Sequence, residues 1–282
     1  MRVLRNLLRS SRYLGVAIVL MATATSLSAA SFTTVDVPGA AHTGAQGINN
    51  QGVIVGFYVT NLGVFHGFVR NGDSFASVDV PGAIGTSANG INNSGAIVGN
   101  YADTTSRQHG FLFEAGSFTT IDFPGAIGTE AFGINESGDI VGFYVDAGGV
   151  NHGFLLSKGG FTSIDFPGAV HTQVYGINGS GQVVGVGFLA SSWQGFSWSK
   201  GRFTSIDISG SNFTVAAGVN KAREVVGYYW TTNWHGFLID KDGLQAVDVP
   251  GAVFTQPHGI NGNGDVVGQY FDGIALHGFL MN

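Results

Sequence analysis

The chain has 282 residues, no Cys and a formal net charge of −6; only 11% of its residues are charged, against 44% that are hydrophobic. This composition excludes a disordered protein and, without Cys, a disulfide framework or a thiolate metal site, and its acidic balance argues against a nucleic-acid-binding surface. The 46 Gly show no three-residue period, which excludes collagen and favours β-structure rich in turns.

The first 30 residues predict a secretory signal peptide. Four Arg residues precede an apolar stretch from Leu14 to Ala22, and the small residues Ser28, Ala29 and Ala30 form a cleavage site. The apolar stretch is too short to span a bilayer, which needs about 20 residues. We therefore expect a secreted protein, extracellular, at the cell surface or in the periplasm, with no membrane span after signal removal.

Six copies of one unit follow in residues 31–282, which we expect to form a single domain. Each copy begins with Phe or Leu and then carries an Asp, a Thr, a Gly-Ile-Asn or Gly-Val-Asn segment, a Val-Gly pair and a His-Gly-Phe segment, in which Gln replaces His in the fourth copy. Only the step from Val-Gly to His-Gly-Phe varies in length, so length variation is confined to one loop. The copies begin at Phe32, Phe75, Phe118, Phe161, Phe203 and Leu244.

Within each copy we predict four short strands, a to d, separated by turn residues. Strand a is centred on Gly-Ile-Asn, and the loop from d to a is expected to run from Gly39 to Gln46 and over the equivalent residues. Strand d is expected to stop at Pro-Gly, because Pro cannot donate to a β-ladder. For the first blade, strands b, c and d are predicted at 53–59, 64–70 and 75–80, the last of these opening the second copy.

Units of four strands and about 40 residues, repeated radially, are typical of a β-propeller. The six Gly-Ile-Asn or Gly-Val-Asn segments predict six blades. The copies begin with an unpaired strand d at 32–37 and end with an unpaired strand c at 277–281. The sequence therefore predicts an all-β, six-bladed propeller, closed by pairing of the N-terminal strand with the C-terminal strand.

The repeated G-I-N-x-x-G-x-I-V-G followed by H-G-F resembles the HAF family of probable extracellular repeats, and the resemblance covers residues 32–282. The resemblance implies a secreted bacterial repeat protein of β-propeller type. It brings no activity or catalytic residue that can be carried over to this chain.

In a propeller the d-to-a and b-to-c loops share one face, here named the variable face, and the a-to-b and c-to-d turns share the other, the turn face. Sequence differences between copies gather on the variable face, where loops on a rigid scaffold often bind ligands. All four Trp lie in the fourth and fifth copies. Their rings suit stacking on a sugar or anchoring a protein partner, and packing between blades is the alternative. The ligand-binding candidates are Trp193, Trp230, Trp234, Tyr229, Tyr175 and His258.

The polar residues that recur in the copies predict a structural role. Five His occupy equivalent positions, one in each of five blades, which is too dispersed for one tetrahedral metal site. We expect the repeated Asp, Thr, Asn and His to satisfy buried backbone groups and to tie each blade to the next. Neither a metal nor a cofactor is expected.

Catalysis would require residues that break the repeat. Glu130, Asp103 and Asp146 are unrepeated carboxylates expected on the variable face, where a pair about 5 to 9 Å apart suits glycosidic cleavage. His42, His171 and His258, expected in d-to-a loops, are candidate bases. Exposed carboxylates without a catalytic role are the alternative.

The sequence thus predicts a monomeric binding or interaction module for a glycan or an extracellular protein, and favours a role without catalysis. Two alternatives stay open: a polysaccharide-degrading glycoside hydrolase or lyase, and a structural surface protein without a small-molecule site. A nucleic-acid partner is not expected.

Overall fold

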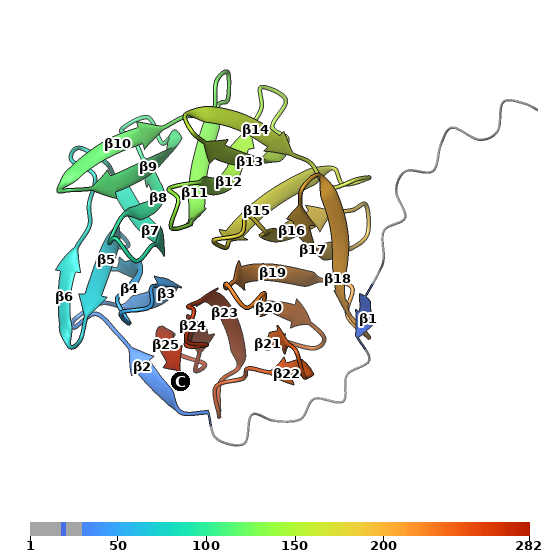
Figure 1. Ribbon diagram of the computed structural model, residues 1–282. Coiled ribbons are helices and arrows are strands. Elements are labelled where there is room, and N and C mark those ends of the chain that lie inside the picture. The colour runs from blue at the N-terminus through green and yellow to red at the C-terminus, as the bar shows by residue number, and fades with distance from the viewer. Residues whose placement is uncertain (1–17, 21–29) are drawn as a thin grey trace, which may run out of the picture.

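The computed structural model describes residues 18–20 and 30–282, and within them six β-sheets stand around a central axis as the blades of a propeller (Figure 1). In blades 1 to 5, the four strands that each repeat supplies follow one another from the axis outward in chain order (Figure 1). Blade 1 comprises β3 (His42–Ile48), β4 (Ile54–Val59), β5 (Phe65–Asn71) and β6 (Ser74–Ser77); blade 2, β7 (Gly85–Ile91), β8 (Ile97–Ala102), β9 (Gln108–Glu114) and β10 (Ser117–Ile121); blade 3, β11 (Gly128–Ile134), β12 (Ile140–Val145), β13 (Asn151–Ser157) and β14 (Gly160–Ile164). Blade 4 comprises β15 (His171–Ile177), β16 (Val183–Phe188), β17 (Trp193–Ser199) and β18 (Arg202–Ile208); blade 5, β19 (Thr214–Val219), β20 (Val225–Trp230), β21 (Trp234–Asp240) and β22 (Gly243–Ala246); blade 6, β23 (Phe254–Ile260), β24 (Val266–Phe271), β25 (Leu276–Met281) and β2 (Phe32–Val35).

The ring closes in blade 6, where the two ends of the propeller meet (Figure 1). Strand β2 pairs antiparallel with β25, from Phe32 opposite Met281 to Val35 opposite Gly278. Two backbone hydrogen bonds between Ser31 and Asn282, each 3.1 Å long, extend this pairing. The predicted six blades and their closure by the N-terminal strand are confirmed.

Blade 4 differs from the prediction of four strands per blade. The short strand β1 (Ile18–Leu20) pairs in parallel with its outer strand β18, so that its sheet has five strands. Apart from residues 18–20 and 30, the predicted signal peptide lies outside the described residues. In the part of the chain that is described, no helix is long and apolar enough to cross a membrane.

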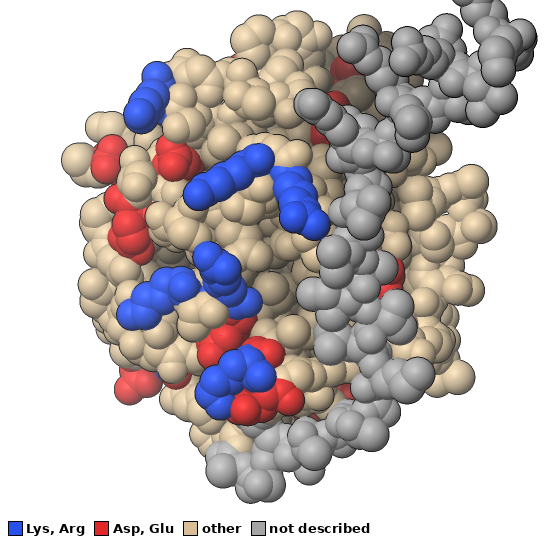
Figure 2. Space-filling model, turned by 45° about the vertical axis from the view of Figure 1, so that its right-hand side comes forward, with Lys and Arg blue, Asp and Glu red and all other residues tan. Residues whose placement is uncertain are grey.

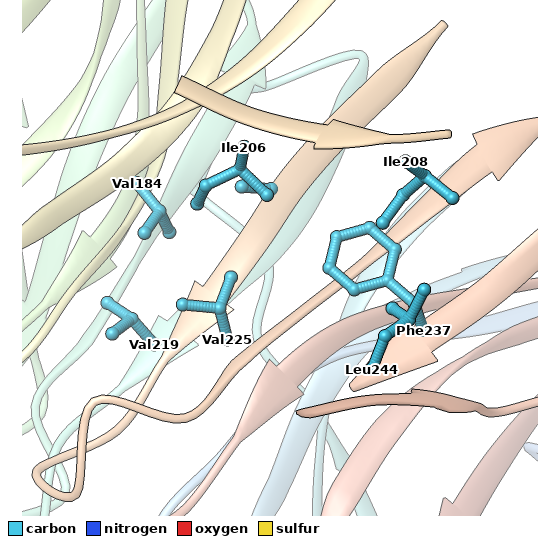
Figure 3. Packing of buried hydrophobic residues seen from close by; sticks show 8 residues of the cluster. Val184, Ile206, Ile208, Val219, Val225, Phe237 and Leu244 are labelled. Atoms are coloured by element: carbon cyan, nitrogen blue, oxygen red, sulfur yellow. The ribbon is translucent and has the colours of Figure 1, made fainter. Parts of the chain in front are cut away.

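The core is a series of layers between neighbouring blades. The Phe of each His-Gly-Phe or Gln-Gly-Phe segment is almost completely buried. Between blades 4 and 5, Ile206 and Ile208 pack with Val225 and Phe237 (Figure 3). The Gly of each Val-Gly pair lies beside the buried Phe ring of the next strand, and a Cβ on Gly56 would lie only 2.0 Å from the carbonyl oxygen of Gly44. Close approach of strands therefore explains one Gly per blade.

The recurring His, Asp and Thr accept or make hydrogen bonds at the ends of the strands, and the His–Asp contact joins two strands of one blade rather than neighbouring blades. In blade 1, His66 Nδ1 lies 3.0 Å from a carboxylate oxygen of Asp79, whose other oxygen accepts the Gly67 N–H. Gln194, which replaces His in blade 4, donates from Nε2 to Asp207 at 2.8 Å. The Thr hydroxyl oxygens accept backbone N–H groups from the d-to-a connection, as Thr43 does from Val37.

The recurring Asn forms a closed ring of hydrogen bonds. Each Asn is buried, its Oδ1 accepts two N–H groups of its own a-to-b turn, and its Nδ2 donates to the carbonyl oxygen of the equivalent Asn in the next blade. The last link, from Asn261 to Asn49, is 3.0 Å long and joins blade 6 to blade 1. The members are Asn49, Asn92, Asn135, Asn178, Asn220 and Asn261.

The innermost strands begin earlier than predicted. Residues 42–46, expected in the d-to-a loop, belong to β3, and 42–45 of them pair with β4, so Gly-Ile-Asn lies at the end of strand a rather than at its centre. The strand ends there because Asn49 Oδ1 accepts the turn N–H groups of Gln51 and Val53. The prediction that His42, His171 and His258 lie in d-to-a loops is therefore wrong: the first two begin β3 and β15, and His258 lies inside β23.

Candidate binding site on the variable face and in the channel

A ring of six residues, one from each innermost strand, lines the central channel. Each directly precedes the Gly-Ile-Asn or Gly-Val-Asn segment, at the point where a β-bulge shifts the register between strands a and b. A bulge re-aims a side chain, and here it turns this side chain toward the axis. Unlike the landmarks around it, this position carries a different residue in every blade: Gln46, Asn89, Phe132, Tyr175, Ala217 and His258.

Together with Phe143, Gln173 and Tyr228, this ring lines a cavity of about 290 Å³. The wall of this cavity has an aromatic side and a polar side. Blades 3, 4 and 5 supply aromatic rings, with the centroids of Phe132 and Phe143 5.5 Å apart and those of Phe132 and Tyr175 5.1 Å apart. Blades 6, 1 and 2 supply the imidazole of His258 and the amides of Gln46 and Asn89.

Burial holds the ionisable groups of the cavity in their neutral forms. Desolvation lowers the pKa of His258 from 6.5 to about 4 and raises the pKa of Tyr228 to about 12. It also raises the pKa of Tyr175, whose hydroxyl donates to Gln173 Oε1 at 2.5 Å. Nε2 of His258 is buried and has no hydrogen-bond partner within the described residues.

Glu130 lies beside this cavity, as the cross-strand neighbour of Phe143 on β11. Burial raises its pKa from 4.5 to about 7, and its charge acts on Tyr175. Glu130, expected on the variable face, belongs to the innermost strand β11 rather than to a connecting loop.

The other two candidate carboxylates, Asp103 and Asp146, form hydrogen bonds within b-to-c turns of the variable face. Asp103 accepts hydrogen bonds from the Thr105 hydroxyl and from N–H groups of its own b-to-c turn, and these bonds lower its pKa to about 2. Asp146 accepts N–H groups of its own turn and lies 3.4 Å from His152 Nε2. Both aspartates are thus held by their own b-to-c turns, whereas Glu130 lies on an innermost strand.

Three of the four Trp meet on the variable face and form what we call the tryptophan cluster: Trp193, Trp230 and Trp234. Trp193 and Trp234 stack across blades 4 and 5 with centroids 5.8 Å apart, and Trp230 meets Trp234 edge to face at 5.3 Å. Phe188 and Phe213 pack against Trp193. Trp230 is 37% exposed, and Trp234 and Trp193 are partly exposed, so the cluster is open to a ligand.

Tyr228 connects the tryptophan cluster to the cavity. Its ring lies 5.3 Å from that of Trp234 on one side and 5.7 Å from that of His258 on the other. The structure therefore brings together the predicted candidates Trp193, Trp230, Trp234 and His258, with Tyr175 on the cavity wall. It does not bring Tyr229 into this group, because Tyr229 packs on Phe237 and His235 inside blade 5. Trp198 likewise packs in the core of blade 4.

Charge is divided between the two faces. Among residues 30–282, every Lys and Arg except Arg107 lies at or next to a turn of the turn face, and Figure 2 shows several of them gathered on one side of the molecule. The variable face carries the Asp of strand d in each blade, at positions 36, 79, 122, 165, 207 and 248, and the b-to-c loop Asp at 103, 146 and 272. Its acidic character disfavours an anionic ligand.

No protein-family model matches the chain, and a comparison with curated protein sequences gives no match either. The resemblance to HAF repeats therefore stays a prediction.

Solved structures similar to this chain are β-propellers of diverse description. A mutant of AofleA from Arthrobotrys oligospora has a TM-score of 0.56 at 12% identity, covering 93% of this chain and 90% of that one. A mutant of the Aleuria aurantia lectin in complex with α-methyl-L-fucoside has a TM-score of 0.53 at 13% identity, covering 88% and 93%. A putative gluconolactonase has a TM-score of 0.52 at 10% identity, covering 93% and 98%. At such identities the likenesses show the six-bladed β-propeller fold and assign no family.

Proposed function

We propose that this protein is a carbohydrate-binding β-propeller that acts outside the cytoplasm and holds a neutral glycan on its variable face, at the tryptophan cluster. The observation that carries the proposal is the stacked pair of Trp193 and Trp234 beside the exposed ring of Trp230. Aromatic rings of this size offer a large, rigid apolar surface. The C–H face of a sugar ring matches such a surface, while its hydroxyl groups stay at the polar edge.

Two further observations support this function. The carboxylates of the variable face would repel uronic or sialic acids, so an uncharged glycan is favoured. The Aleuria aurantia lectin, which shares the fold, was solved with a fucoside bound. The localisation follows from the signal peptide predicted in residues 1–30.

A glycan array tests the proposal with two variants of the protein. Native protein is expected to bind a set of neutral glycans, and Trp230→Ala combined with Trp234→Ala is expected to weaken that binding by at least about tenfold, since central aromatic anchors contribute about 2 kcal/mol or more. Leu62→Ala is the matched control, because Leu62 is 91% exposed in the b-to-c loop of blade 1, on the same face. The assignment of the binding site to the tryptophan cluster would be contradicted if the double variant bound the glycans as tightly as the native protein. It would also be contradicted if Leu62→Ala weakened binding as much as the double variant.

A further inference from the structure

We propose that the central cavity is a second ligand site, separate from the tryptophan cluster, for one neutral, hydroxyl-rich molecule of about monosaccharide size. The proposed function supplies the chemical class of this ligand, while the location and size of the site rest on the cavity alone.

The cavity exists because one blade leaves a gap in the channel ring. At the bulge position, blades 3 and 4 carry Phe132 and Tyr175, whereas blade 5 carries Ala217 between them and His258. The same backbone position thus accepts a large ring in two blades and leaves space in a third. A volume of about 290 Å³ is at the lower end of ligand pockets, about 300 to 1,000 Å³. It suits a single small molecule rather than a chain of sugars.

The two-sided wall matches an amphipathic ring. The rings of Phe132, Phe143 and Tyr175 provide an apolar surface on one side. On the other side, the buried Nε2 of His258 lacks a partner among the described residues. Buried polar atoms are nearly always hydrogen-bonded, and a hydroxyl group both donates and accepts, so it satisfies either tautomer of His258.

The charges around the cavity favour a neutral ligand. The titratable groups that line it are Tyr175 from β15, Tyr228 from β20 and His258 from β23. Glu130 from β11 lies next to the wall, as the cross-strand neighbour of Phe143, and acts on Tyr175. Burial shifts all four toward their neutral forms. A charged ligand would meet the same desolvation cost that keeps these side chains neutral, whereas a polyol would not.

Isothermal titration with L-fucose, D-glucose and D-galactose tests this site in the Trp193→Ala, Trp230→Ala background. This background removes the stacked pair and the exposed ring of the tryptophan cluster but keeps Trp234 against Tyr228 of the cavity wall. One molecule per chain of at least one sugar is expected to bind there. Adding Ala217→Phe, which places in blade 5 the residue that blade 3 already carries, is expected to weaken binding at least about tenfold while the melting temperature is retained. His258→Leu is expected to weaken sugar binding by a similar factor. His258→Gln, which introduces the residue that blade 1 carries as Gln46, is expected to weaken sugar binding by less.

Two results would overturn the proposal. In one, none of the three sugars binds to the background variant. In the other, adding Ala217→Phe and adding His258→Leu both leave the affinity for the sugar unchanged. The glycan-array result for the tryptophan variants is a separate readout. Failure of the surface site and failure of the cavity site are therefore distinguishable.

Discussion

At pH 8, Glu130→Gln is expected to raise the free energy of unfolding by about 3 kcal/mol. Burial raises the pKa of this carboxyl group from 4.5 to about 7, so the unfolded chain releases its proton more readily than the folded chain does. Each pKa unit corresponds to about 1.4 kcal/mol, and the penalty grows as the pH rises from 4.5 through 7. Gln keeps the shape of the protonated acid without this penalty.

The same variant is expected to match the native chain within about 0.5 kcal/mol at pH 4.5, where Glu130 is largely protonated in the folded state and only begins to ionise in the unfolded one. Urea unfolding at both pH values measures the difference. Glu114→Gln, an exposed site on β9, is the control and is expected to change little at either pH. A constant difference between Glu130→Gln and the native chain across this range would show that Glu130 is not buried as described.

Val35→Asp is expected to lower the free energy of unfolding by at least about 3 kcal/mol. Val35 is 1% exposed on β2 and packs with Ala45, Ile54 and Phe68 of blade 1 and with Val267 of blade 6. An Asp there would be an unpaired buried charge and would also leave a poorly filled core. Urea unfolding at pH 7 measures the loss.

Two further variants show whether the loss of unfolding free energy in Val35→Asp comes from disrupting the strand that closes the ring. Val78→Asp changes the equivalent buried residue of blade 1, which follows β6, and is expected to cost as much as Val35→Asp. Thr33→Asp lies on the exposed side of β2 and is expected to change stability by less than about 0.5 kcal/mol. If Val78→Asp destabilised the protein while Val35→Asp did not, β2 would be dispensable and the ring would not depend on it.

The blade count and the closure were predictable because the landmarks that repeat in the sequence are the residues that make the repeating contacts. Each Asn of the hydrogen-bonded ring and each Gly beside a buried Phe must be the same in every blade, since each meets the same backbone geometry. His277 and Asp36, which are 241 residues apart, make the same contact as His66 and Asp79. The phase of the repeat therefore identified the strand that closes the ring.

The start of the innermost strands was not predictable by the same reasoning. Around the repeated Thr43, residues 42 and 44–46 differ between copies, and this variation resembles that of a loop. In the structure residues 42–45 pair with β4 and Gln46 forms the bulge that follows. Side chains here face the channel, where no neighbour fixes the residue type. Because residues that face the channel vary between copies, the segments that contain His258 and Glu130 were predicted as loops, although both belong to innermost strands.

The tryptophan cluster and the cavity were predictable to different degrees. The concentration of Trp in two neighbouring copies indicated the cluster, and the repeat placed its members near b-to-c loops. The cavity depends on Ala217, whose small side chain carries no signal by itself. The sign that was missed is the position before Gly-Ile-Asn, where six copies carry six different residues between fixed neighbours.

The indole N–H signals of the four Trp in a nuclear magnetic resonance titration test most directly whether the variable face binds glycans at the tryptophan cluster. With the neutral glycan that binds best on the array, we expect the signals of Trp193, Trp230 and Trp234 to shift. The signal of Trp198, which packs in the core of blade 4, is expected to stay in place. Binding that leaves the first three signals unchanged, or that shifts only Trp198, would contradict the account.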